Sequence, residues 1–342
     1  MAFEAYGVTS SDTTKKSTVD WDAMNQYIIE TAGLQQPETL SGVISVLVDL
    51  GTQKQPDSQW DLDKEDKDLS IEELNEKYAD EIEKHGIYFA EGYTKTGKAI
   101  LKHVPQKDRQ SVAFAVDFPD IIIDKGQFFK DSDGNFESNP KPLRLWMGGQ
   151  FYNGSGMVVQ NMTPLKLTKD DKIGWTMNPR STVYKMAVSS KVISAGEAFL
   201  PQNIDSLVGK TLQFEARVFM KQAKNGKSYY TEQIKFVGGL PRGSKDLEID
   251  NTYVIEFNGE NDLTSLKELR GHIVNTIKCA TNFEGSPIQR QLSQVESERG
   301  SGSGVDDSDD TSSGDDPTSN GDTKTTKGKQ SKVTEPSDDD LF

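Results

Sequence analysis

The segment 212–236 constrains the fold most, because apolar and polar residues alternate on both sides of a turn signal. A period of two is typical of a strand with one buried face, and Asn225-Gly226 is typical of a tight hairpin turn. The positions expected to point inward are Leu212, Phe214, Ala216, Val218 and Met220 on the first strand, and Tyr230, Ile234 and Phe236 on the second. The segment therefore predicts an antiparallel hairpin packed on a core.

Other strand patterns predict that this hairpin belongs to a mainly β body. A β-branched run covers 41–50, and 109–124 alternates through Val112, Phe114, Val116 and Phe118, with Pro119 as a bulge or an edge. Shorter patterns cover 97–104, 143–152, 157–167 and 253–257, and residues 131–135 favour a turn. Many short strands with glycine turns are typical of a sandwich or a partly open barrel.

Three segments predict helices. Asp20 is a suitable N-cap for a helix reaching residue 34. Ser70 and Glu73 form a capping box ahead of the apolar stripe of a helix over 71–85, which His85-Gly86 ends. A third helix is expected around 263–279, whereas 183–190 fits a helix and a strand equally.

Acidic charge is concentrated in two segments of a chain whose net charge is −15. Residues 295–342 hold 13 acidic and 5 basic residues, and 54–84 hold 12 acidic and 5 basic residues, so the remainder is neutral. The acidity therefore does not argue against a nucleic-acid partner. We expect an N-terminal arm with a short helix over 1–40, and a body over 41–293 that carries an acidic helical insertion at about 54–85. A disordered acidic tail is expected over 294–342.

Several classes of protein are excluded by what the sequence lacks. It has no run of about 18 apolar residues, a single cysteine (Cys279) and three scattered histidines, which argues against a membrane span, a disulfide scaffold and a zinc cage. The start of the chain does not look like a secretory signal, so we expect reducing cytoplasm. Residues 92–98 resemble a phosphate-binding loop, but Ala99 replaces its Ser/Thr and a strand pattern follows. We expect no enzyme, no cofactor and no metal.

The outward face of the 212–236 hairpin is the candidate binding site. It combines aromatic rings, on which bases can stack, with cations that can hold phosphates; its residues are Arg217, Phe219, Lys221, Tyr229, Thr231, Gln233 and Lys235, with Lys227 in the turn. The alternative is that Phe219 and Tyr229 pack beneath the insertion or a neighbouring chain. Further aromatic and basic residues can extend this site into a longer path for a nucleic-acid strand, although each of them taken alone is more often a core or a surface residue. They are Trp146, Tyr152, Lys166, Trp175, Arg180, Tyr184, Lys185 and Lys210.

The tail carries a second signal, the run Asp338-Asp339-Asp340-Leu341-Phe342. Acidic residues followed by an apolar pair can dock in a basic-rimmed apolar pocket of a partner protein. They can also compete with phosphates for the chain's own cations. A tail that serves only solubility is the alternative, although solubility gives no reason for the final Leu-Phe.

These residues resemble phage-encoded single-stranded DNA-binding proteins. The acidic, Phe-terminated tail is similar to the tails of that class, and so are the run 41–53 (Ser-Gly-Val-Ile-Ser-Val-Leu-Val-Asp-Leu-Gly-Thr-Gln) and the run 207–218 (Leu-Val-Gly-Lys-Thr-Leu-Gln-Phe-Glu-Ala-Arg-Val) with its hairpin 225–230. The resemblance covers well under half of the chain, and 1–34 and 54–84 have no counterpart in it. It implies an oligonucleotide-binding (OB-like) barrel, no enzymatic activity, and contact with replication proteins through the tail.

The sequence thus predicts a sequence-tolerant single-stranded DNA-binding protein of phage replication and recombination, in the cytoplasm of the infected bacterial host. Its expected partners are single-stranded DNA and, through the tail, a phage DNA polymerase, helicase-primase or recombinase, with no membrane. The alternative is a non-enzymatic structural or interaction protein of a virion or replication complex. Homo-oligomerisation stays open, as does the choice between DNA and RNA. The helix over 71–85 can be a dimer contact, a lid on the groove, or neither.

Overall fold

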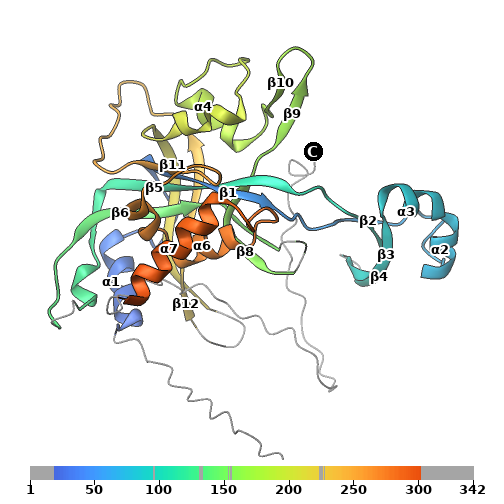
Figure 1. Cartoon of the computed structure of the whole chain (residues 1–342), viewed down its shortest axis with the longest axis horizontal. Coiled ribbons are helices and arrows are strands. Elements are labelled where there is room, and N and C mark those ends of the chain that lie inside the picture. Colours follow the sequence, from blue (N-terminus) through green and yellow to red (C-terminus); the bar gives the residue numbers. More distant parts are fainter. Residues whose placement is uncertain are drawn as a thin grey trace, which may run out of the picture. The chain divides into compact units, whose positions relative to one another are not determined.

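The computed structural model describes residues 19–94, 97–130, 134–152, 154, 156–222, 226 and 228–301. Residues 299–301 are described by their backbone alone. The fold is mainly β, with one large sheet curled into a half-barrel and several helices packed on it (Figure 1). This confirms the expected β-rich body with peripheral helices. No helix within these ranges is long and apolar enough to cross a membrane.

The large sheet has eight strands in the order β12–β11–β1–β5–β8–β7, with β13 added beside β1 and β6 beside β5. Their bounds are β1 Glu38–Gln53, β5 Arg109–Asp124, β6 Pro140–Met147, β7 Gly149–Tyr152, β8 Val158–Pro164, β11 Thr211–Gln222, β12 Ser228–Gly238 and β13 Tyr253–Ile255. Every pair is antiparallel except β1 with β13. Strand β12 also lies beside β6, which draws the sheet into its curl.

Strands β1 and β5 are buried on both faces, so their apolar residues do not strictly alternate with polar ones. Phe114 and Val116 face one core, while Ala113 and Ala115 face a second core on the other side. The predicted inward positions of 109–124 are therefore correct for the first core. The register shift after Phe118 agrees with the bulge expected at Pro119.

The first core is covered by α1 (Trp21–Ala32), α4 (Thr182–Ser189) and the 3-10 helix η2 (Pro201–Leu207). Asp20 caps α1 as expected, since its Oδ1 accepts the backbone N–H of Ala23 at 3.0 Å. The ambiguous segment 183–190 is helical because Ser181 caps α4, which then buries Val183, Tyr184, Met186 and Ala187.

The second core is covered by α5 (Leu263–Lys267), α6 (Gly271–Lys278) and α7 (Pro287–Ser301), of which α6 and α7 lie across the sheet in Figure 1. The helix expected over 263–279 is thus two helices. The tail does not begin at 294, because α7 continues to Ser301 and Val295 is 2% exposed. Ile288, Leu292 and Val295 form one helical face that the polar composition of the segment obscured.

Residues 58–104, named here the insertion lobe, form a separate three-stranded sheet in the order β2–β4–β3. Its elements are β2 (Ser58–Asp61), α2 (Ile71–Lys77), α3 (Ala79–His85), β3 (Tyr88–Thr94) and β4 (Gly97–Val104), with a small core of Leu62, Leu74, Ile87 and Phe89. The capping box forms, with Ser70 Oγ accepting from Glu73 N at 3.2 Å. Two expectations are corrected: the helix over 71–85 breaks at Tyr78, and the strand 97–104 pairs inside this lobe instead of joining the body.

Two expected strands are also divided. The segment 143–152 breaks at Gly148, whose φ of 140° and close approach to the Asn161 backbone exclude a side chain. The segment 157–167 ends at Pro164, and β9 (Leu167–Asp170) then pairs with β10 (Gly174–Met177). Most of the turn expected at 131–135 lies outside the described residues.

Candidate nucleic-acid interface

The hairpin predicted over 212–236 is present as β11 and β12, with its inward side as expected. Leu212, Phe214, Ala216 and Val218 are buried, Tyr230 is buried opposite them, and Ile234 and Phe236 pack partly against the same core. Met220 was also expected inward, but it is 38% exposed. It lies two residues before the strand ends and beyond the last buried residue of β11, although Tyr230 opposite it belongs to the core.

The opposite side of the hairpin, named here the hairpin face, collects the cations and rings that were expected there. The register pairs Lys221 with Tyr229 and Phe219 with Thr231, and paired residues of antiparallel strands project to the same side. Arg217 lies opposite Gln233, and Lys235 lies opposite Glu215. Lys227, also assigned to this site, lies outside the described residues.

Each aromatic ring of the hairpin face has a cation beside it. The guanidinium carbon of Arg217 lies 3.9 Å from the centroid of the Phe219 ring, and Lys221 Nζ lies 5.7 Å from the centroid of the Tyr229 ring. Arg217 is also held by its Nε, which donates to the backbone oxygen of Gln35 at 2.9 Å. Both rings are only half-buried. The face therefore offers two flat apolar surfaces, each next to a positive charge.

A groove of about 230 Å³ lies beside the middle of the hairpin, between Pro37 and the segments 215–217 of β11 and 233–235 of β12. Its lining residues are Pro37, Glu215, Ala216, Arg217, Gln233, Ile234 and Lys235. Glu215 contributes one negative charge to this lining, and Arg217 and Lys235 contribute two positive charges, so the net charge of the groove is positive. Such a groove favours an anionic ligand over a neutral one.

Two aromatic residues proposed for the path are core residues instead. Trp146 is 3% exposed, and its ring lies edge-on to His272 with their centroids 6.5 Å apart. Tyr184 is buried in α4, where its hydroxyl donates to the Glu197 carbonyl oxygen and accepts from Gly196 N, each at 3.0 Å. Neither ring is accessible to a base, so both assignments are wrong.

The remaining residues of the path are accessible but belong to other elements. Tyr152 on β7 is 59% exposed and Trp175 on β10 is 60% exposed, the latter opposite Lys169. Lys185 is exposed on α4, Arg180 and Lys210 are exposed in loops, and Lys166 is half-buried. They stay candidates for an extended path, because exposure is necessary for a contact but does not establish one.

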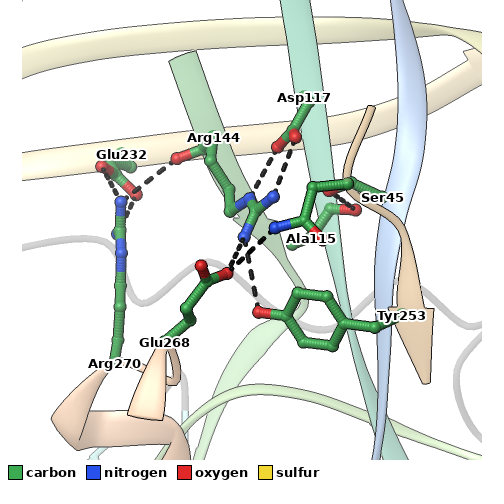
Figure 2. A network of polar contacts seen from close by, with 9 residues as sticks. Ser45, Ala115, Asp117, Arg144, Glu232, Tyr253, Glu268 and Arg270 are labelled. Carbon is green, nitrogen blue, oxygen red and sulfur yellow. Dashed lines mark hydrogen bonds and ion pairs between the residues drawn. The ribbon is translucent and has the colours of Figure 1, made fainter. Parts of the chain in front are cut away.

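A polar network centred on Arg144 was missed by the sequence analysis (Figure 2). Arg144 on β6 donates to both carboxylate oxygens of Asp117 on β5, at 2.7 and 2.9 Å, and lies 3.9 Å from Glu268. Tyr253 on β13 lies beside the same guanidinium, and burial raises the pKa of its hydroxyl to about 12. These residues are far apart in sequence, so no local sequence pattern predicts their contacts. Their contacts join β5, β6 and β13 to the end of α5.

The resemblance of 92–98 to a phosphate-binding loop is not matched by the geometry of this segment. Strands β3 and β4 form a hairpin across 92–98, with 95 and 96 outside the described residues, where a phosphate loop requires a strand-to-helix turn. Lys98 Nζ lies 5.8 Å from the centroid of the Tyr93 ring and 3.8 Å from Glu91. In the described part of the chain, no three His, Cys, Asp or Glu side chains gather as metal ligands.

The tail residues Asp338, Asp339, Asp340, Leu341 and Phe342 lie outside the described residues. Comparison with known protein families, with curated proteins and with solved structures finds no match to this chain. The geometry of the hairpin face is therefore the main observation that bears on function.

Proposed function

We propose that this protein binds single-stranded DNA without sequence preference, through the hairpin face. The observation that carries the proposal is the repeated pairing of a cation with a half-exposed ring, Arg217 with Phe219 and Lys221 with Tyr229, on one side of a hairpin. A mainly β body with a curled half-barrel sheet is compatible with an OB-like barrel. The proposed setting is phage DNA replication, recombination and repair in an infected bacterial host.

Bases stack on Phe219 and Tyr229, each stack contributing roughly 1–3 kcal/mol. Stacking is tolerant of sequence because every base presents a flat π-face. Phosphates are held by Arg217, Lys221 and Lys235, together with Lys227, which lies outside the described residues. Duplex DNA keeps its bases paired and stacked inside the helix, so these rings gain nothing from it and binding to duplex is much weaker.

The acidic tail is proposed to act in two ways. Its carboxylates compete with DNA phosphates for the cations of the hairpin face, which tunes affinity. Its Leu341-Phe342 pair docks in an apolar pocket of a replication protein, whether polymerase, helicase-primase or recombinase. The protein then protects single-stranded DNA and recruits the enzymes that work on it.

The test is a titration of the purified full chain with fluorescent single-stranded and duplex oligonucleotides of equal length, at two salt concentrations. We expect single-strand binding that weakens with salt and duplex binding that is far weaker. A full-chain variant with Asp338, Asp339 and Asp340 replaced by Asn removes competition by the tail. Absence of binding by both proteins contradicts the proposal and favours the alternative, a non-enzymatic structural or interaction protein.

A further inference from the structure

Strands β9 and β10 form a small sheet of their own outside the half-barrel, and residues 167–177 are named here the arm. Within the described residues, β9 pairs only with β10. The base of the arm is fixed, because Met177 is buried and its N–H donates to the carbonyl oxygen of Phe199 at 2.7 Å. Figure 1 shows the arm projecting beyond the large sheet, next to α4.

The outer part of the arm exposes large apolar side chains. Trp175 is 60% exposed and Ile173 is 53% exposed. Neither side chain packs against any of the three cores formed by the described residues. Apolar groups stabilise a fold by being buried, so these two contribute little to it. Exposed apolar groups that gather on one element are typical of an interaction site.

The arm and the helix that follows it carry an excess of positive charge. Residues 166–191 hold six basic and two acidic residues, in a chain whose net charge is −15. Asp170 is engaged by the turn of the arm, since its Oδ1 accepts the N–H groups of Lys172 and Ile173 at 2.8 and 3.1 Å. Lys169 and Lys172 are exposed and make no ion pair with the described residues. These charges favour an anionic ligand.

The exposed ring of the arm has a cation in register with it. Trp175 lies directly opposite Lys169, and paired residues of antiparallel strands project to the same side. The hairpin face has the same arrangement, with Tyr229 opposite Lys221. A flat ring beside an unpaired lysine suits a nucleic-acid strand, because a base stacks on the ring while the lysine attracts the phosphates.

The insertion lobe presents the contrasting case. Trp60 is 49% exposed and lies opposite Lys102, but Lys102 Nζ is 2.7 Å from Oε2 of Glu81, which neutralises its charge. Residues 54–84 hold 12 acidic and 5 basic residues, so the surroundings of Trp60 repel a polyanion. Trp60 is therefore a matched control for Trp175, with a similar exposure and the opposite electrostatic setting.

The arm is connected to the hairpin through η2 and α4. The 3-10 helix η2 contacts β10, and α4 contacts both η2 and β12. The approach is closest just after β12, where a side chain at Gly239 would collide with the carbonyl oxygen of Ser189 at the end of α4. The elements next to the arm thus meet β12 at its end, away from the turn of the hairpin.

We propose that the arm is a second contact for the bound single strand. One base stacks on Trp175, and the phosphates beside it lie near Lys169 and Lys172. The arm reaches only strands that extend past the hairpin face toward the end of β12, so it lengthens the binding site. This inference rests on the proposed function, because it assigns a further part of the same DNA-binding site.

The first test is a titration of the full chain with fluorescent oligothymidylates of increasing length, from about 4 nucleotides upward, the lower end of the site size of one OB fold. Trp175→Ala should bind long strands roughly tenfold more weakly than the wild type, the effect of losing one stacked base. The shortest strands that the wild type binds should be unaffected. Trp60→Ala should match the wild type at every length, and Trp175→Phe, which keeps a ring, should retain most of the affinity for long strands.

The outcomes separate this inference from the proposed function. No binding of any strand by the wild type overturns the proposed function, and the inference with it. Wild-type binding with equal affinities of Trp175→Ala and Trp60→Ala for long strands overturns the inference alone. A loss of the same size at every length also overturns it, because a contact beyond the hairpin face cannot affect strands too short to reach it.

A second test locates the strand and distinguishes DNA from a protein partner of the arm. Long oligonucleotides that contain photoreactive 4-thiothymidine are cross-linked to the full chain, and the modified peptides are identified by mass spectrometry. Cross-links within 166–177 in addition to β11 and β12 support the inference, whereas cross-links confined to β11 and β12 overturn it. Sedimentation without DNA should give Trp175→Ala the same oligomeric state as the wild type. A change in that state with unchanged DNA affinity overturns the inference and assigns the arm to a contact between copies.

Discussion

Arg270 Nη1 lies 2.7 Å from Oε2 of Glu232, and the two side chains are only 16% and 13% exposed (Figure 2). Glu232 belongs to β12, between Thr231 and Gln233, whose side chains project to the hairpin face. Arg270 begins α6 as its N-cap residue and also donates to the backbone oxygen of Arg144 at 3.1 Å. This ion pair therefore links the start of α6, one of the helices that cover the second core, to β12, the strand that carries Tyr229.

Replacing Arg270 with Ala should lower the free energy of unfolding by about 3 kcal/mol, because it leaves the Glu232 carboxylate buried without its partner. Chemical denaturation monitored by circular dichroism measures the change. The double variant Arg270→Ala, Glu232→Gln should be less destabilised than the sum of the single variants, because it leaves no uncompensated charge. Single variants that differ from the wild type by less than about 0.5 kcal/mol contradict a stabilising role.

The control for this prediction is the exposed ion pair between Lys278 and Glu296, whose charged atoms lie 2.6 Å apart. Exposed pairs contribute about 0.2–1 kcal/mol, so Lys278→Ala should have a small effect. Comparing the two pairs separates the effect of burial from that of removing a positive charge near α6.

Removing either ring of the hairpin face should weaken single-strand binding. Phe219→Ala and Tyr229→Ala each should cost about 1–3 kcal/mol of binding free energy, because each removes a stacking surface. Oligonucleotide titrations at constant salt measure the loss. The matched control is Tyr93→Ala, since Tyr93 is an exposed ring on the insertion lobe with a lysine beside it. A control that loses as much affinity as Tyr229→Ala would show that the loss is not specific to the hairpin face.

The salt dependence of binding should identify the cations that hold phosphates. Lys221→Gln and Lys235→Gln each should reduce the slope of log K against log salt by about 0.7, the value for one phosphate contact of a single strand. The exposed Lys64, outside the hairpin face, serves as the control, and Lys64→Gln should leave the slope unchanged. An unchanged slope in the Lys221 and Lys235 variants would place the phosphates elsewhere.

Acidification should loosen the insertion lobe. Lys77 and the hydroxyl of Tyr78 both donate to the Asp66 carboxylate, and these hydrogen bonds lower the pKa of Asp66. A carboxyl whose pKa is lower in the folded state stabilises the fold above its unfolded pKa of about 3.9, and this contribution is lost as the pH falls through the folded pKa. Asp66→Asn should therefore destabilise α2 at neutral pH but not at strongly acidic pH.

Hydrogen exchange of the α2 amides at several pH values, in the full chain, measures this effect. Asp63→Asn, an exposed neighbour of Asp66, is the control and should not change α2 protection. A difference between Asp66→Asn and the wild type that persists unchanged at acidic pH contradicts the electrostatic explanation and favours loss of packing.

Local patterns predicted the elements whose signals lie within a few residues. The capping box of Ser70 and Glu73, the cap at Asp20 and the alternation along β11 each depend on neighbours in sequence, and each is observed. The hairpin face follows from the same alternation, because the side opposite a buried face of a strand is determined by the period of two.

Features that depend on distant contacts could not be predicted in this way. Trp146 looked like a stacking ring because a strand pattern does not reveal whether both faces of the sheet are covered. Strand β4 pairs with β2 and β3 inside the insertion lobe, and the sequence of a single strand does not identify its partners. Arg270 and Glu232 meet only because the fold brings the N-cap residue of α6 beside β12. Helix α7 was missed because its polar residues outnumber the three apolar residues that it buries, although the spacing of those three was helical.

Deleting residues 333–342 should leave single-strand binding unchanged or tighter, and it should abolish recruitment of a replication protein. The reason is that these residues add four carboxylates, which compete with DNA for cations, and the Leu341-Phe342 pair proposed to enter a partner's pocket. Titrations of the deleted and full chains, with co-purification of a tagged polymerase, measure both effects. A chain with Leu341 and Phe342 replaced by Ser, which keeps the carboxylates, should lose recruitment alone. Weaker DNA binding after the deletion contradicts competition by the tail, because removing a competitor cannot lower affinity.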